Sequence, residues 1–341
     1  MKINLLELHP DEFKELLLRQ VDKKFRIKQL LNWIYVHRIL DPDLMSNIPA
    51  DFKTFLKKEF SNFIPRILDK QISQDSSTKY LLELEDENRI EMVIIPREGR
   101  TTLCLSSQVG CARNCLFCAT AKIGLIRNLY VHEILSQVFI TLKELQDRKL
   151  TNIVFMGMGE PLDNYENVLK SIRILQHEEG FKFSPRRITL STSGVIPRLN
   201  DLADSNLKVK LAVSLNSAIQ EKRAEIMPLT KQYPLAELKK CLLNFRKKTS
   251  YRITFEYVMI KNFNLAAEDS QALIDFIGDI SCKLNLIAWN KVDYLPYETP
   301  DENDIRDFLK AINKLSSAVT FRSSRGADIN AACGQLAGQY Y

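Results

Sequence analysis

Long apolar stretches are absent from this sequence, and so is any N-terminal pattern typical of a secretion signal. A membrane-spanning helix needs about 20 consecutive apolar residues, and a signal needs a basic start followed by an apolar core. Internal repeats and low-complexity segments are missing as well. Because seven cysteines occur without a secretory signal, we expect a cytoplasmic location, where thiols stay reduced, and no membrane association.

Charge of one sign is not in large excess either. The 341 residues include 48 lysines and arginines and 42 aspartates and glutamates, for a net charge of +6. This balance permits a polyanionic partner without requiring one. The hydrophobic and charged fractions are ordinary for a globular protein, and the length suits one large α/β domain with a smaller addition.

A fourth clustered cysteine is also lacking. Cys111, Cys115 and Cys118 form the pattern C-x3-C-x2-C, which offers three thiolate ligands from one short loop. A structural zinc site normally has four ligands, often as two separated pairs, and no second pair is present. An iron–sulfur cluster fits better, because thiolate is its usual ligand. Three ligands leave one iron of a four-iron cluster open, and open metal positions are where substrate chemistry takes place.

The order of the expected elements predicts an α/β fold. Residues 1–64 read as a small helical unit with helices beginning near residues 10, 27 and 49, and residues 65–98 as a β-hairpin connection with strands at 79–85 and 89–95. From residue 99 to 341, strands alternate with amphipathic helices, which implies parallel strands with right-handed crossovers. The expected strands are 102–106, 152–156, 188–191, 209–215, 253–260 and 284–289, with a further edge strand near 319–322.

Four further segments accompany the cysteine loop: 106–111 (SSQVGC), 157–162 (GMGEPL), 190–194 (LSTSG) and 325–338 (RGADINAACGQLAG). Together with the cysteine spacing, which is typical of radical S-adenosylmethionine (SAM) enzymes, they resemble the bacterial dual-specificity RNA methyltransferases. The similarity runs from about residue 24 almost to the last residue, with the motifs in family order. The resemblance implies an open (βα)6 partial barrel that binds a 4Fe-4S cluster and SAM, two SAM molecules being used per turnover. It also implies methylation of carbon 2 of an adenosine in 23S rRNA, at the peptidyl transferase centre, and of the adenosine 3′ to the anticodon in tRNA.

The resemblance assigns a SAM pocket at the ends of the barrel strands, where barrels bind their ligands. Its residues are Gly159, Glu160, Ser191, Ser214, Leu215, Asn216 and Asn290. Asn216 departs from the family pattern, because many relatives have histidine there. Asparagine still donates and accepts hydrogen bonds, so we expect SAM binding to be retained.

Two cysteines outside the loop carry the unusual chemistry that the resemblance implies. Carbon 2 of adenine is electron-poor, so it does not attack the methyl group of SAM directly. In the family, one SAM methylates the residue matching Cys333, and a second yields the radical that takes a hydrogen atom from that methyl group. The methylene radical adds to carbon 2, Glu91 matches the proton acceptor, and Cys104 attacks the sulfur of Cys333. The product leaves, and a transient Cys104–Cys333 disulfide remains to be reduced.

The predicted partners are 23S rRNA, tRNA and an electron donor of the flavodoxin or ferredoxin type, and we expect a monomer. Basic residues of the helical unit are ordinary solvated side chains when taken singly; the resemblance favours an RNA-binding surface there. Two alternatives stay open at this point: methylation of carbon 8 of the same rRNA adenosine, which confers antibiotic resistance, or a non-catalytic iron–sulfur protein that binds RNA and senses redox state. A radical SAM enzyme for a small molecule is a third, against which the helical unit argues.

Overall fold

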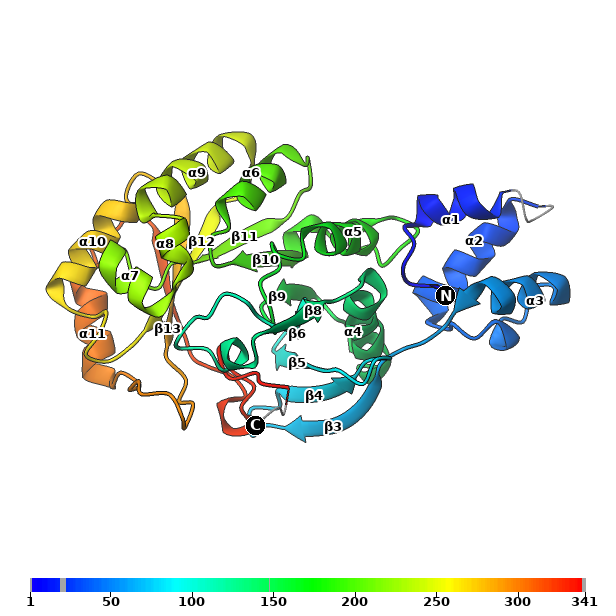
Figure 1. The fold of residues 1–341 in the computed structure, drawn as a ribbon, viewed down its shortest axis with the longest axis horizontal. Coiled ribbons are helices and arrows are strands. Elements are labelled where there is room, and N and C mark those ends of the chain that lie inside the picture. The colour runs from blue at the N-terminus through cyan, green and yellow to red at the C-terminus, as the bar shows by residue number, and fades with distance from the viewer. Residues whose placement is uncertain (1, 19–22, 147, 339–341) are drawn as a thin grey trace.

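A single ten-stranded sheet runs through the centre of the protein (Figure 1). The computed structural model describes residues 2–18, 23–146 and 148–338. The strand order is β14-β13-β12-β11-β10-β9-β6-β5-β4-β3; the strands from β6 to β14 are parallel, and β5, β4 and β3 are antiparallel along one edge. The strands are β3 (Arg66–Ile72), β4 (Thr78–Glu83), β5 (Arg89–Arg97), β6 (Arg100–Leu105), β9 (Asn152–Phe155), β10 (Ile188–Thr192), β11 (Lys210–Ser214), β12 (Ile253–Met259), β13 (Cys282–Ala288) and β14 (Ala318–Arg322).

The predicted partial barrel is confirmed, and the six expected strands are followed by the expected seventh, β14. Residues such as Leu103, Ile153 and Leu190 are fully buried, as expected for parallel strands covered by crossover helices. The helices lie on the outer face of the curved sheet (Figure 1). They are α4 (Val131–Glu144), α5 (Tyr165–Gln176), α6 (Ile196–Asp204), α7 (Gln220–Ile226), α8 (Leu229–Gln232), α9 (Leu235–Lys248), α10 (Ala267–Ile277) and α11 (Glu302–Ala311). Within the described residues, no helix is long and apolar enough to cross a membrane.

The antiparallel edge contains one strand more than the hairpin expected from the sequence. The β4–β5 pair is present, and β3 joins it with a register irregularity between Ile67 and Asp69. Most of the β3 side chains are exposed or half-buried and polar. Because the strand has no alternating apolar face, no periodic pattern predicts it.

The N-terminal unit packs three helices at one end of the sheet, beside α4 and α5 (Figure 1). They are α1 (Pro10–Leu17), α2 (Phe25–Asn32), which continues as a π-helix over Trp33–His37, and α3 (Ala50–Glu59). His9 caps α1 while Glu12 bonds back to its backbone N–H, and Pro10 occupies the first turn. Phe13, Leu30 and Leu56 are fully buried in the continuous hydrophobic core.

Candidate active site

The three clustered cysteines lie on a loop clamped at both ends by a small antiparallel ribbon, β7 (Gln108–Gly110) and β8 (Leu125–Asn128). Gly110 has φ +76°, and a Cβ there would lie 1.7 Å from the carbonyl oxygen of Gly124, so only glycine fits. The N–H of Cys111 donates to that same oxygen at 2.8 Å. The ribbon therefore holds the start of the cysteine loop in one position.

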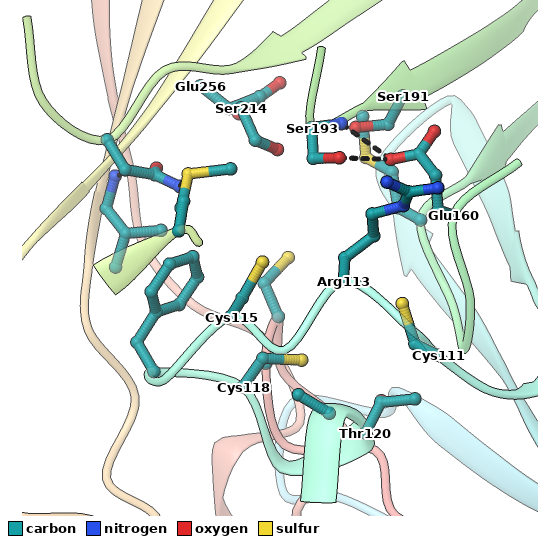
Figure 2. A pocket seen from close by; sticks show the side chains of 18 of the residues that line it. Cys111, Arg113, Cys115, Cys118, Thr120, Glu160, Ser191, Ser193, Ser214 and Glu256 are labelled. Carbon is teal, nitrogen blue, oxygen red and sulfur yellow. Dashed lines mark hydrogen bonds between the residues drawn. The ribbon is translucent and has the colours of Figure 1, made fainter. Parts of the chain in front are cut away.

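All three thiols line one cavity at the carboxyl ends of the strands, where Figure 2 shows Cys111, Cys115 and Cys118 along one wall. The cavity contains about 1080 Å³ of space, its open mouth included. That volume is at the upper end for small-molecule sites and has room for a cluster and a nucleoside-sized cofactor together. The site thus matches the size of the predicted ligands.

The spacing of the sulfurs distinguishes a cluster from a single ion. Tetrahedral Zn–S bonds of about 2.3 Å place sulfurs roughly 4 Å apart. The sulfurs of the three loop cysteines do not all lie within 4.8 Å of one another. Among the described residues, the group of three potential ligands that meets this distance is His9, Asp11 and His177. The three thiols line one cavity but are farther apart than the ligands of a single ion. This spacing fits a cluster of several metal ions.

Burial strongly affects the ionisation of these thiols. It raises the pKa of Cys111 to about 12 and also raises the pKa values of Cys115 and Cys118, with the neighbouring sulfurs adding to the shift at Cys115. The thiols are therefore protonated at neutral pH in the metal-free chain. Cluster binding has to release these protons, so it is favoured by rising pH.

The segment at 157–162 turns sharply beside the cysteine loop. Gly159 has φ +102°, and a Cβ there would meet the Gln108 side chain at 2.6 Å. Glu160 is buried, and its Oε2 accepts hydrogen bonds from the N–H and the hydroxyl of Ser193, both at 2.7 Å (Figure 2). Burial raises the pKa of Glu160, and the two Ser193 bonds oppose that shift. The Glu160 carboxylate thus connects the segment after β9 to the end of β10.

Six of the seven predicted SAM-pocket residues line the cavity: Gly159, Glu160, Ser191, Ser214, Asn216 and Asn290. Leu215 is not among the lining residues. Its side chain is in the hydrophobic core, its N–H donates to the Glu256 carbonyl at 2.9 Å, and its carbonyl accepts from Arg223 at 2.9 Å. The apolar side chain explains why this position faces the core while its polar neighbours face the cavity.

The Asn216 side chain is engaged by the protein. Its Oδ1 accepts the N–H of Val258 at 3.0 Å, and its Nδ2 contacts the sulfur of Met227 at 3.3 Å. The residue has φ 58°, a left-handed conformation that asparagine tolerates well. Asparagine thus has a structural role at the position where many relatives carry histidine.

Cys333 opens into the same cavity from a loop of the C-terminal segment. It is exposed because it faces the hollow of the site, yet the surrounding walls desolvate it and raise its pKa. Asn290 holds its carbonyl at 3.0 Å, and the N–H of Ala119 donates to the carbonyl of Gly334 at 2.7 Å. The cysteine loop and the Cys333 loop are therefore in direct contact.

Cys104 is buried on β6 and does not line the cavity. Burial raises its pKa, and the Cys333 sulfur adds to that shift, so the two sulfurs are electrostatic neighbours. Both are free thiols. Cys333 lines the cavity and Cys104 does not, and the transient disulfide between them stays a prediction.

Glu91 does not line the cavity. Its Oε1 pairs with the buried Lys79 at 3.2 Å, and its Oε2 accepts the N–H groups of Ala337 and Gly338 at 2.8 and 3.0 Å. Oε2 thus fastens the segment that follows Cys333, while Oε1 is held by Lys79 on β4. In this arrangement Glu91 is an anchor of the C-terminal segment.

The sequence analysis missed a buried arginine beneath the site. Arg223 is 1% exposed and donates to the carbonyls of Ser193, Ser214 and Leu215 and to the hydroxyl of Thr230, at 2.6 to 3.1 Å. Burial lowers its pKa to about 10, and the adjacent Cys115 opposes that shift. The Arg223 guanidinium thus connects the carboxyl ends of β10 and β11, and it is close enough to Cys115 to interact with it electrostatically.

Two charged residues on the inner face of the sheet were also missed. Glu256 on β12 and Arg322 on β14 line the cavity, with Arg322 Nη1 3.8 Å from Glu256 Oε1. The available sequence signal is the carboxylate inside an otherwise apolar strand (ITFEYVM). A charged residue in a buried parallel strand needs a partner or a function.

Comparisons with known proteins agree with this architecture. Residues 105–276 match the model of the radical SAM superfamily, and residues 3–61 match that of the ribosomal RNA large subunit methyltransferase N-terminal domain. A solved radical SAM methyltransferase from Sphaerobacter thermophilus superposes with a TM-score of 0.95 at 36% identity, covering 99% of this chain and 100% of its own.

Curated relatives match over nearly the whole chain. A probable dual-specificity RNA methyltransferase RlmN from Dictyoglomus turgidum is 43% identical over 340 residues, covering 99% of this chain and 97% of the relative. The dual-specificity RNA methyltransferase RlmN from Nitratiruptor sp. is 40% identical over 349 residues, covering 98% and 97%. With both halves of the fold and the cysteine loop accounted for, this chain belongs to the RlmN-type dual-specificity RNA methyltransferases, which are SAM-dependent enzymes of the radical SAM superfamily.

Proposed function

We propose that this enzyme methylates carbon 2 of an adenosine in 23S rRNA, at the peptidyl transferase centre, and of the adenosine 3′ to the anticodon in tRNA. The observation that carries the proposal is the arrangement of five cysteines. Cys111, Cys115, Cys118 and Cys333 line one cavity, and the buried Cys104 is near enough to Cys333 for the two sulfurs to interact electrostatically. A relay through a methylated cysteine needs this grouping, whereas a cluster with a purely structural role does not.

Cys111, Cys115 and Cys118 would hold the 4Fe-4S cluster, and Gly159, Glu160, Ser191, Ser214, Asn216 and Asn290 would surround SAM. When bound, the cluster would supply one-electron reduction of SAM, the radical chemistry of the superfamily. The polypeptide orients the cofactor by its glycine turn and excludes bulk water by its apolar walls.

Cys333 is the proposed methyl acceptor. Its thiolate, not its thiol, is the nucleophile, and its position in the cavity gives it access to a SAM molecule held by the same walls. The bond from Asn290 to its carbonyl fixes the loop that presents it.

Cys104 is the proposed resolving thiol, which attacks the sulfur of Cys333 and frees the methylated base. Glu91 is the proposed acceptor of the carbon-2 proton. Since both oxygens of Glu91 bind the protein in this structure, that role requires the C-terminal segment to move away from it.

We further propose that the N-terminal helical unit contacts RNA through its basic side chains, and that the target adenosine leaves its base stack to reach the cavity. A monomer in the cytoplasm, reduced by a flavodoxin- or ferredoxin-type donor, completes the proposal. The match of residues 3–61 to the ribosomal RNA large subunit methyltransferase N-terminal domain supports an RNA-binding role for the helical unit.

Mass spectrometry of the anaerobically purified protein tests the relay. The peptide containing Cys333 should carry an additional methyl group, which is absent from the Cys333→Ala variant. An unmodified Cys333 in protein that contains its cluster and abundant SAM would contradict the relay.

Product mapping then tests the position of methylation. Digestion of rRNA and tRNA after reaction should yield 2-methyladenosine from both substrates. 8-Methyladenosine in its place would overturn the carbon-2 proposal while leaving the cysteine relay intact.

A further inference from the structure

One carboxylate in the cavity wall has a free oxygen. Glu256 projects from β12 into the cavity near Ser214, as Figure 2 shows, and is 6% exposed. Asn285 on β13 donates to its Oε1 at 2.9 Å. Its buried Oε2 accepts no hydrogen bond from the described residues.

The other lining carboxylate is fully engaged. Glu160 accepts bonds from Ser193 and Leu162 on its two oxygens. Arg113, the cavity residue next to the cluster cysteines, pairs with Asp163. Among the carboxylates of the described lining, Glu256 is therefore the one with an oxygen that has no hydrogen-bond partner and is available to a ligand or a proton.

The charged and titratable groups around Glu256 come from three directions. Arg322 on β14 lies 3.8 Å from its Oε1, Cys333 of the C-terminal loop lines the same cavity and interacts with it electrostatically, and Glu160, Arg113 and the cluster cysteines also line this cavity. Burial raises the pKa of Glu256, and Arg322 and Asn285 oppose that shift. A carboxylate with a raised pKa is a stronger base than one in water.

Cys333 needs a base at this place. Burial raises the pKa of the Cys333 thiol above the usual 9.0; Arg322 opposes that shift, and Glu256 and then Cys118 add to it. At neutral pH the residue is accordingly a thiol, while the species that accepts a methyl group is the thiolate. An oriented neighbour that removes the proton typically accelerates such a step by about 10²–10⁴-fold.

We propose that Glu256 accepts the thiol proton of Cys333 when this cysteine takes its methyl group from SAM, directly or through one water. The inference rests on the proposed methylation of Cys333. The S–H bond of Cys333 and the methyl–sulfur bond of SAM break, the new S–CH₃ bond forms, S-adenosylhomocysteine leaves, and the proton moves to Oε2 of Glu256. Arg322 stabilises the thiolate before it is methylated. This proton is distinct from the carbon-2 proton assigned to Glu91.

The test follows methylation of Cys333 alone, without a reductant, so that the radical step does not run. The protein is expressed under iron limitation and reconstituted anaerobically, and mass spectrometry first verifies that Cys333 is unmethylated. Methylation is then timed with saturating SAM across pH 6 to 10 in the wild type and in Glu256→Gln. Glu302→Gln, an exposed substitution on α11, is the matched control.

We expect Glu256→Gln to methylate Cys333 roughly a hundred-fold more slowly at pH 7. Its rate should rise about tenfold per pH unit as the thiol ionises unaided, approaching the wild-type rate at high pH. The control should match the wild type throughout. Iron content and circular dichroism verify that each variant is folded and holds its cluster.

A second variant keeps the proposal testable if Glu256→Gln does not fold. Arg322→Gln removes the charge that favours the thiolate, and we expect the rising limb of the pH profile to move to higher pH while Glu256 still accepts the proton. An unchanged pH dependence of Cys333 methylation in Arg322→Gln would contradict the roles assigned to Glu256 and Arg322.

Three other results separate the possibilities. Equal rates and equal pH profiles for the wild type and Glu256→Gln would overturn the role of Glu256 and leave the proposed function standing. A change confined to the SAM concentration needed for half-maximal rate would make Glu256 a cofactor contact and also overturn the inference. Failure of the wild type to methylate Cys333 would remove the proposed relay and this inference with it.

Discussion

Replacing Glu91 by glutamine removes a buried negative charge without changing the size of the side chain. The carboxylate pairs with Lys79, whose side chain is 9% exposed, and binds the N–H groups of Ala337 and Gly338. Removing one partner of a buried pair typically destabilises a protein by about 3–5 kcal/mol, because the other charge is left alone. We therefore expect Glu91→Gln to lower the free energy of unfolding by that amount.

The same substitution weakens the tether of the C-terminal segment. Hydrogen bonds to a charged group contribute about 1.5–3 kcal/mol each, against about 0.5–1.5 kcal/mol for neutral ones. Two bonds changed from charged to neutral lose about 2 kcal/mol together, which corresponds to a roughly thirty-fold increase in local opening at 1.36 kcal/mol per tenfold. Hydrogen exchange at the amides of residues 337 and 338 should accelerate by that factor.

A double substitution separates the two effects. Adding Lys79→Met to Glu91→Gln removes the lone charge, so urea unfolding should regain most of the lost stability. Exchange at residues 337 and 338 should stay fast, because the carboxylate is still missing. Unchanged exchange in Glu91→Gln would refute the anchoring role, and full recovery of slow exchange in the double variant would show that the ion pair alone mattered.

Three further substitutions or conditions have defined outcomes. Arg223→Met leaves buried carbonyls without donors, so we expect a loss of about 3 kcal/mol and a lower urea midpoint. Burial, reinforced by His177, lowers the pKa of His9 below 6.5. Neutral His9 therefore stabilises the fold fully above pH 6.5, and this stabilisation is lost as the pH falls through the lowered pKa. Local opening of α1, measured by amide hydrogen exchange, should increase in acid in the wild type but not in His9→Asn. Gly110→Ala places a Cβ against a backbone oxygen and should reduce bound iron per chain, whereas Gly99→Ala, also at positive φ but in open space, should not.

Local patterns in the sequence predicted most of the sheet. The strand runs near residues 152, 188 and 253 are short, apolar and β-branched, and each begins in the structure at the predicted residue. Glycines with positive φ beside the cysteines were visible as a motif as well. Such features depend on a few neighbouring residues, so they can be read without knowing the fold.

The missed features depend on contacts between distant segments. Arg223 looks like any charged residue on an amphipathic helix, and only the fold directs it to the carbonyls of Ser193 and Ser214. The same holds for Glu91, whose exposed-looking position in a strand gave no hint of bonds to residues almost 250 positions away. The side chain of Leu215 lies in the core rather than in the cavity lining, and its place in the SAM pocket stays a prediction.

The C-terminal segment is fastened at both ends to parts of the protein made much earlier. Ser73 and Asp75, in the turn between β3 and β4, bind Asp328 and Gly326, and Glu91 binds the residues beyond Cys333. Every strand of the sheet precedes this segment in the chain. During synthesis, in which earlier parts of a chain fold first, the cysteine loop and all strands of the sheet are made before the segment that carries Cys333. This segment is therefore the last part of the site to be made, and the turn that holds its beginning is among the first parts of the sheet.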